Sequence, residues 1–182
     1  MASMPGYFET TPGGGASIAL DGVEISILRS LAVQLLELIG PGDEPEDGAD
    51  PLAQLFADGP TKPPDDPAVA RLFPDAYEDA PDAADFRRFT ENDLRTRKRE
   101  DALAVVRTLD GGGPVLGLTP QECRQWLGTL NDLRLTIGTR LDVSEEDDSL
   151  YKLPDSDPRK PLVMAYLWLG GLQESLVETL MP

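Results

Sequence analysis

The sequence predicts a mainly α fold: a single-domain helical bundle with a small N-terminal β-hairpin and a long acidic, proline-rich connection. Apolar residues recur at helical spacing along four long stretches, as they do in helices that bury one face in a core. Capping residues, glycines and prolines mark the ends of these stretches. Because 182 residues suffice for one domain with a real core, residues 1–182 are predicted to form a single domain.

Residues 1–20 are predicted to form the β-hairpin. Two short runs in which apolar and polar residues alternate, residues 7–10 and 16–20, flank a glycine-rich stretch that suits a turn. Since an isolated hairpin is only marginally stable in water, we expect this one to lie on the helical core or to pair with another strand.

A helix is predicted over residues 22–39. Asp21 and Glu24 have the spacing of a capping box, and Gly40 followed by Pro41 ends the apolar repeat. The apolar residues of this helix are expected in the core: Val23, Ile27, Leu28, Leu31, Leu35 and Leu38.

Residues 41–81 are predicted to be a mostly irregular acidic, proline-rich segment. The stretch from Pro41 to Asp85 holds nine of the 17 prolines and 13 of the 33 acidic residues. Such a composition favours irregular structure over regular helices. Two short helices are expected within the segment, each opened by an Asp-Pro step, at Asp50 and at Asp66.

A long helix is predicted over residues 82–110, which contain neither proline nor glycine. Thr90 and Asp93 have the spacing of a second cap, so we allow for a bend at that point. The apolar seam of this helix is expected to run through Phe86, Phe89, Leu94, Ala102, Val105 and Leu109.

The same helix carries the chain's basic cluster, which consists of Arg87, Arg88, Arg95, Arg97, Lys98 and Arg99. On a helix, Arg88, Arg95 and Arg99 fall near one stripe, which suits contact with a protein partner or with the phosphates of nucleic acid. The alternative is that these cations pair with neighbouring carboxylates inside the protein, which has a net charge of −17.

Two further helices are predicted, over residues 120–141 and 158–181. Thr119 and Glu122 form the clearest capping box in the sequence, with Pro120 at the first helical position. Asp157 followed by Pro158 has the pattern of the start of the last helix.

Four polar residues, Asn131, Asp132, Arg134 and Arg140, lie on the otherwise mostly apolar helix 120–141. Charged groups in such a setting need partners. We interpret them as a structural ion-pair network that joins helices, or alternatively as a recognition surface built on arginines that bind in a bidentate manner.

The chain contains no histidine and a single cysteine, Cys123. Histidine is the usual general base near neutral pH and the commonest metal ligand, so conventional triads and histidine-containing zinc sites are excluded. We therefore expect no enzyme, no metal and no cofactor. Cys123 shares the apolar face of its helix and is interpreted as a small buried hydrophobe, with a redox role as the alternative.

The localisation that the sequence predicts is cytoplasmic. No stretch reaches the roughly 18 consecutive apolar residues of a membrane span, and the N-terminus lacks the pattern of a secretory signal. A lone cysteine also fits a reducing compartment.

Three stretches give the chain a family resemblance: 90–99, 126–141 and 166–176, of which the run Asn131-Asp132-Leu133-Arg134-Leu135 is fairly specific. With them the chain resembles an actinomycete domain-of-unknown-function family that includes the AosR-type oxidative-stress transcriptional regulators. The resemblance covers most of the chain and implies a single regulatory domain. In that family, redox sensing is associated with a pair of cysteines that form a disulfide, whereas this chain has only Cys123.

The resemblance implies regulation of transcription under oxidative stress through contact with RNA polymerase or a sigma factor. Because the protein is acidic, we expect protein contact to dominate, with promoter DNA at most an additional partner through residues 87–99. The alternative is a non-DNA-binding adaptor or scaffold linked to proteolysis or cysteine metabolism. Formation of a homo-oligomer is left open.

Overall fold

The computed structural model describes residues 6–41, 52 and 59–182. In chain order its elements are β1 (Phe8–Thr10), β2 (Ala16–Ala19), α1 (Gly22–Ile39), α3 (Pro67–Leu72), α4 (Ala80–Asp110), β3 (Val115–Leu118), α5 (Pro120–Leu141), the 3-10 helix η1 (Ser149–Lys152) and α6 (Lys160–Leu180). The mainly α fold that the sequence predicts is confirmed. The short helix predicted to begin at Asp50 lies outside the described residues, apart from Leu52.

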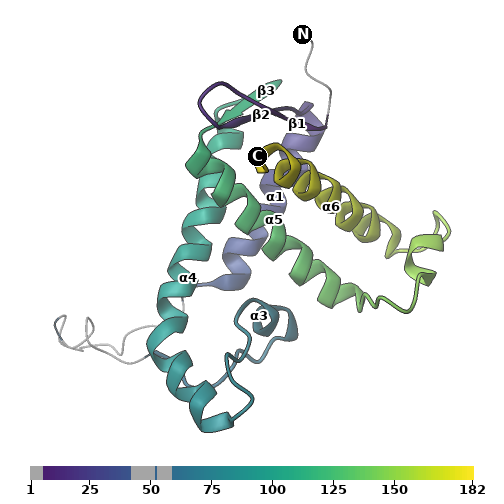
Figure 1. The fold of residues 1–182 in the computed structure, drawn as a ribbon. Helices are drawn as coiled ribbons and strands as arrows, with labels where there is room; N and C mark the ends of the chain where they lie inside the picture. The colour runs from purple at the N-terminus through teal and green to yellow at the C-terminus, as the bar shows by residue number, and fades with distance from the viewer. Residues whose placement is uncertain (1–5, 42–51, 53–58) are drawn as a thin grey trace.

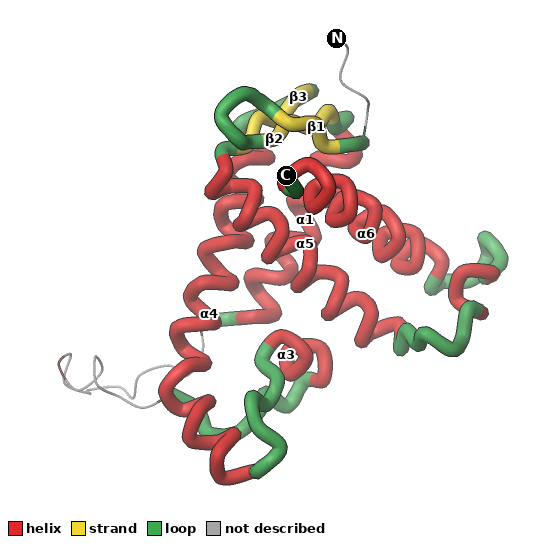
Figure 2. Tube along the Cα trace, viewed as in Figure 1, coloured by secondary structure: helices red, strands yellow, loops and turns green. Residues whose placement is uncertain are grey.

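Helix α5 lies in the middle of the bundle, with α4 along one side, α6 on the other and the small sheet at one end (Figures 1 and 2). Helices α1 and α5 pack against α4, and α6 packs against α5. Helix α3 packs against α5 near the end of α4 that is far from the sheet. The first half of α4 therefore projects beyond the part of the bundle that carries the sheet.

The core contains side chains from the sheet and from every long helix. The largest fully buried side chains are Ile18, Leu20, Leu28, Leu35, Phe73, Val105, Leu109, Trp126, Leu130, Leu169, Leu172 and Leu176. The prediction that Val23 and Ile27 belong to the core is wrong, because both are exposed. Only the face of α1 that contains Leu28, Ala32 and Leu35 is buried in the bundle.

The predicted hairpin forms, and it pairs with a third strand that the sequence did not indicate. The sheet has the order β1-β2-β3 with antiparallel neighbours, so that Phe8 lies opposite Ile18 and Ile18 opposite Leu116. These three side chains are buried on the inner face. Strand β3 was missed because it is four residues long and carries a glycine, which gives no alternating pattern.

The outer edge of β1 is closed by α6. The backbone N–H of Phe8 donates to the hydroxyl of Ser175 at 2.7 Å, and the hydroxyl of Thr179 donates to the carbonyl of Phe8 at 3.2 Å. These bonds satisfy backbone groups that an edge strand otherwise leaves open. They also attach the end of α6 to the sheet.

Local capping bonds explain where α1, α3 and α5 begin. Asp21 with Glu24 and Thr119 with Glu122 each form the predicted reciprocal capping box. The carboxylate of Asp66 accepts the backbone N–H of Ala68 at the start of α3.

Two predicted helix starts are corrected. Helix α4 begins at Ala80 rather than at residue 82, because Asp79 is its N-cap and accepts the N–H of Asp82. Helix α6 spans Lys160–Leu180 instead of 158–181, because Asp157 accepts the N–H of Arg159 in a turn that precedes the helix.

No second cap interrupts α4 at Thr90. The hydroxyl of Thr90 donates to the carbonyl of Phe86 at 2.7 Å, four residues earlier, so the side chain bonds within the helix. The helix runs through this position as one element from Ala80 to Asp110.

Candidate interaction surface on helix α4

In the N-terminal half of α4, charged residues are buried and phenylalanines are exposed, which reverses the arrangement that the sequence predicts. Arg87, Glu91 and Arg95 are buried, with exposed fractions of 5%, 4% and 9%, whereas Phe86 and Phe89 are 45% and 64% exposed. The predicted apolar seam is therefore wrong at these two phenylalanines. It holds at Leu94, which is partly buried against the core, and in the C-terminal half of the helix, where the buried residues include Ala102, Val105 and Leu109.

Ion pairs account for the buried charges. Nη1 of Arg87 donates to Oε1 of Glu91 at 2.6 Å, and Nη2 of Arg87 donates to Oδ1 of Asp75 at 2.8 Å. Nη2 of Arg95 lies 3.5 Å from the other carboxylate oxygen of Glu91. Burial disfavours the charged form of Arg87, but the hydrogen bonds and negative charges of Asp75 and Glu91 together outweigh burial and raise the pKa of this guanidinium. Glu91 is thus shared between two arginines.

The C-terminal end of α1 supplies the second reason why cations face inward. Its last turn contains no basic residue, and its final carbonyls need donors. Arg95 donates to the carbonyl of Ile39, and Arg99 donates to that of Leu36 at 3.1 Å. Positive charge is favourable at this end of a helix, so the two arginines of α4 cap α1. Arg95 also lies over the ring of Phe73, 4.5 Å from its centroid.

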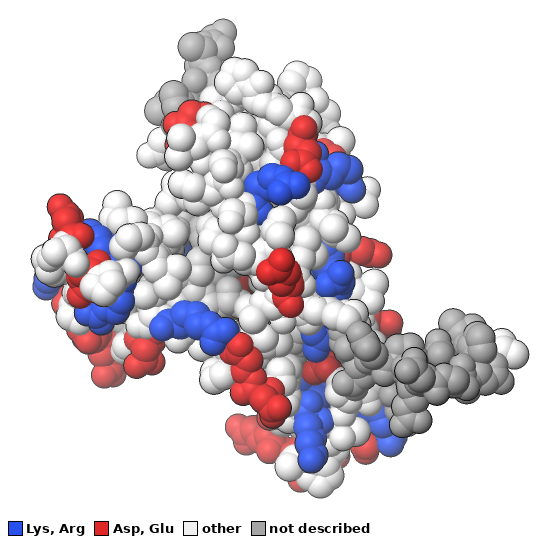
Figure 3. All heavy atoms as spheres, turned by 180° about the vertical axis from the view of Figure 1, so that it is seen from behind, with Lys and Arg blue, Asp and Glu red and all other residues white. Residues whose placement is uncertain are grey.

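The rest of the basic cluster is divided between internal contacts and the surface. Arg88 lies 3.7 Å from Asp85 and 4.6 Å from the centroid of Phe89, and Lys98 pairs with Asp132 at 2.8 Å. Arg97 is exposed. The cations on the face shown in Figure 3 are separated by acidic and uncharged residues. Contact of the cluster with a partner or nucleic acid stays a prediction, with Arg97 as its exposed member.

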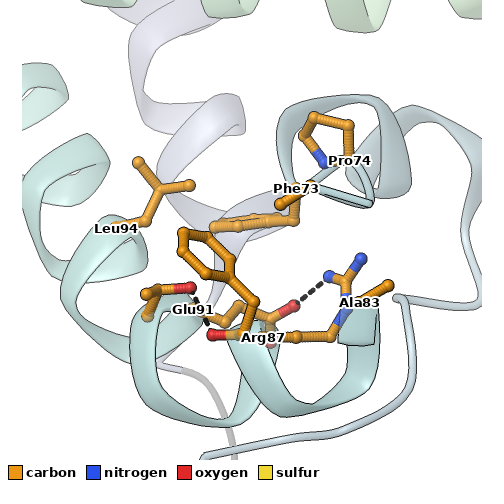
Figure 4. Close-up of a pocket in the computed structure, with 9 residues that line it drawn as sticks. Phe73, Pro74, Ala83, Arg87, Glu91 and Leu94 are labelled. Carbon is orange, nitrogen blue, oxygen red and sulfur yellow. Dashed lines mark hydrogen bonds and ion pairs between the residues drawn. The ribbon is translucent and has the colours of Figure 1, made fainter. Parts of the chain in front are cut away.

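A small pocket lies beside the buried ion pairs, between α4 and residues 73–76, which follow α3. Figure 4 shows Phe73 and Pro74 on one side and Ala83, Arg87, Glu91 and Leu94 of α4 on the other. Its volume of about 50 Å³ holds a water molecule or the tip of one side chain. It is far smaller than the roughly 300–1,000 Å³ of a typical ligand site.

An exposed pair of aromatic side chains lies beside this pocket. Phe86 lines it and contacts Tyr77 edge to face, with the ring centroids 5.7 Å apart. Tyr77 is 52% exposed. Exposed aromatic residues that cluster in this way are typical of protein contact surfaces.

Three of the four polar residues singled out on α5 have separate partners. Buried Asp132 accepts from Lys98 of α4, and Arg140 donates to both carboxylate oxygens of Asp66 at 2.9 and 2.6 Å. Arg134 donates to the amide oxygen of Gln173 in α6 at 2.9 Å, and Asn131 is exposed. Asp132, Arg140 and Arg134 therefore each join α5 to another helix, through separate contacts in place of one network.

A second carboxylate lies near Asp132. Burial, and then the charge of Asp132, raise the pKa of Asp101 from about 3.8 to about 6. Asp101 faces α5 at Gly128, where an added Cβ would lie 2.7 Å from its Oδ2. Burial also raises the pKa of Asp132, against the opposing effect of Lys98. The two carboxylates and Lys98 form a titratable contact between α4 and α5.

This contact predicts that stability falls as pH rises. The pKa of Asp101 is higher in the folded protein than in the unfolded chain, so its ionisation between about pH 4 and pH 7 weakens the fold. Asp101→Asn is expected to raise the free energy of unfolding by about 1–2 kcal/mol above about pH 7, and by much less near pH 4. Urea unfolding at both pH values measures this difference. Asp93→Asn, an exposed change on the same helix, is the control, and equal effects of the two substitutions would contradict the prediction.

Cys123 lies in the core. Its side chain is inaccessible to solvent, its thiol is 4.0 Å from the carbonyl of Leu118, and burial raises its pKa. Reactive thiols instead have exposure and a lowered pKa. The structure thus places Cys123 as a hydrophobe between the sheet and α5.

Among residues 6–41, 52 and 59–182, no group of three or more carboxylates or thiols is arranged to hold a metal ion. Within the same residues, no helix combines the length and the apolar character that crossing a bilayer requires.

Comparison with known proteins gives one family and several relatives. The sequence profile described as "Domain of unknown function (DUF2017)" matches residues 4–180. Proteins named "Oxidative stress regulator AosR" from Mycobacterium tuberculosis (strain ATCC 25618 / H37Rv) and Mycobacterium bovis are each 30% identical to this chain, over 95% of its length and 85% of theirs. No solved structure matches the chain significantly.

Proposed function

This chain belongs to the DUF2017 family, and we propose that it is an oxidative-stress transcriptional regulator that acts mainly through protein contact with RNA polymerase or a sigma factor. The similarity to proteins named oxidative stress regulators supports the regulatory role. The exposed aromatic residues of α4 support protein contact as its means.

The observation that carries the proposal is the reversed polarity of α4. Three of its arginines, Arg87, Arg95 and Arg99, are turned inward to Glu91 or to the end of α1. Phe86 and Phe89 are instead exposed to solvent. A surface built to hold phosphates would present its cations outward. A protein with a net charge of −17 also repels the DNA backbone as a whole, so DNA affinity has to come from the partner.

The proposal includes no catalytic activity. The chain has no histidine, and its single thiol is buried. Detection of oxidants by Cys123 itself is not part of the proposal, because its thiol is shielded from solvent and its pKa is raised.

The proposal is tested by affinity purification of the tagged full-length protein from actinomycete cells, with nuclease treatment before elution. We expect polymerase subunits or a sigma factor to be enriched and to stay bound after nuclease treatment. Replacing exposed Arg97 with glutamine should leave this enrichment unchanged, whereas its loss would show that this cation makes the contact. Protease or biosynthetic partners without polymerase would defeat the proposal and favour the adaptor alternative.

A further inference from the structure

We propose that Asp82, Phe86, Phe89 and Asp93 of α4, here called the α4 stripe, dock an amphipathic helix of a partner protein that has an apolar centre and Lys or Arg at both ends. The inference rests on the proposed function, because it names the chemistry of the partner that makes the protein contact.

The spacing of the α4 stripe is that of one face of a helix. Its members lie at i, i+4, i+7 and i+11, and all four are exposed. At a rise of about 1.5 Å per residue, Asp82 and Asp93 lie about 16 Å apart along the axis, with the two rings between them. A partner helix that packs along α4 would contact all four residues over about three turns.

The apolar centre of the stripe can contribute substantial binding energy. Phe86 and Phe89 are 45% and 64% exposed, and Tyr77 adds a third exposed ring against Phe86. Aromatic residues of this kind dominate interface energetics when a partner covers them. The adjoining pocket of about 50 Å³ can take the tip of one leucine or methionine from the partner.

The stripe is held rigidly from behind. On the opposite side of the same turns, Arg87 and Glu91 are buried in ion pairs, and Arg95 donates to the end of α1. Arg88 lies over the ring of Phe89 and near Asp85. A surface that is already ordered loses little conformational freedom on binding.

The charge around the stripe selects a basic partner. Residues 74–86 contain no lysine or arginine, and their acidic residues, all exposed, are Asp75, Glu78, Asp79, Asp82 and Asp85. Asp93 adds a carboxylate beyond Phe89. Cations on the partner would meet these carboxylates at both ends of the rings, which fixes register and speeds association. An acidic helix of the same apolar content would be repelled.

The test uses a synthetic 15-residue helical peptide with leucines along one face and lysines at both ends, and a matched peptide with glutamates at the ends. Binding of each labelled peptide to the full-length protein is measured by fluorescence anisotropy. We expect the lysine peptide to bind at least tenfold more tightly than the glutamate peptide. Equal affinities would overturn the charge assignment.

Variants locate the binding site. Phe89→Ser and Phe86→Ser should each weaken binding of the lysine peptide at least tenfold, and thermal unfolding should show that both variants stay folded, since these rings are exposed. Leu103→Ser, an exposed apolar change in the C-terminal half of α4, is the matched control and should bind normally. Unchanged binding by both Phe variants would place the binding site elsewhere. A dimer of this protein that Phe89→Ser abolishes would show that the partner is a second copy of the chain.

Affinity purification with Phe89→Ser separates this inference from the proposed function. If polymerase or a sigma factor is recovered with the wild type and lost with Phe89→Ser, both stand. If it is recovered equally with the two proteins, the proposed function stands and the docking site is wrong. If the lysine peptide binds through Phe89 but no transcription protein is recovered, the docking site stands and the proposed function fails.

Discussion

Replacing Glu91 with alanine is expected to lower the free energy of unfolding by about 3–5 kcal/mol. The carboxylate of Glu91 is 4% exposed and is the shared partner of Arg87 and Arg95. Its removal leaves Arg95 without this counter-charge and Arg87 with Asp75 as its remaining carboxylate partner. Breaking a buried ion pair costs more than the intact pair contributes, because a buried charge is left behind. Urea unfolding followed by circular dichroism measures the loss.

Asp93→Ala is the matched control, because Asp93 is an exposed acidic residue two positions along the same helix. It should change stability by no more than about 0.5 kcal/mol. A loss below about 1 kcal/mol for Glu91→Ala would mean that water solvates these arginines, contrary to the burial described above. The α4 stripe would then lack the rigid support that its proposed docking role requires.

Replacing Trp126 with alanine is expected to cost about 3–5 kcal/mol as well, for a different reason. Trp126 is fully buried, and its ring lies edge to face with that of Phe8, with centroids 5.9 Å apart. Its indole Nε1 donates to the hydroxyl of Thr108 at 2.8 Å. The side chain thus joins the sheet, α4 and α5, and its removal leaves a large cavity where the three meet.

Trp126→Phe separates the contributions of the ring and of the hydrogen bond. It keeps most of the apolar volume and loses the donor to Thr108, so we expect a cost of about 1–2 kcal/mol. Thermal unfolding of the two variants provides the comparison. If Trp126→Ala were no more destabilising than Trp126→Phe, the contact of this side chain with Phe8 would contribute little to the attachment of the sheet.

The helix starts that the sequence predicted well are those set by local bonds. Asp21 with Glu24, and Thr119 with Glu122, satisfy backbone donors within three residues, so no distant element has to be known. The start of α6 was misplaced because Asp157 has the same cap pattern but accepts from a turn before the helix. A cap pattern alone does not tell whether the following residues continue as a helix.

For the candidate site, the sequence indicated the right helix but the wrong face. Phe86 and Phe89 belong to the apolar repeat of residues 82–110, and the arginines of the same stretch looked like its surface. One signal pointed to the actual arrangement: Glu91 lies four residues from both Arg87 and Arg95, the spacing of ion pairs on one helix face. That spacing occurs equally on exposed helices, so it does not reveal burial.

The sequence by itself determined the mainly α fold, the ends of α1 and α5, and the resemblance to the family, because helical periodicity and capping depend on residues a few positions apart. The tertiary structure decided that β3 joins the hairpin, that Lys98 pairs with Asp132, and that α4 turns its charges inward and its aromatic rings outward. Those outcomes depend on groups far apart in the chain, such as the carbonyl of Ile39 that accepts from Arg95. A buried charge is stable only where such partners converge, and only the folded chain brings them together.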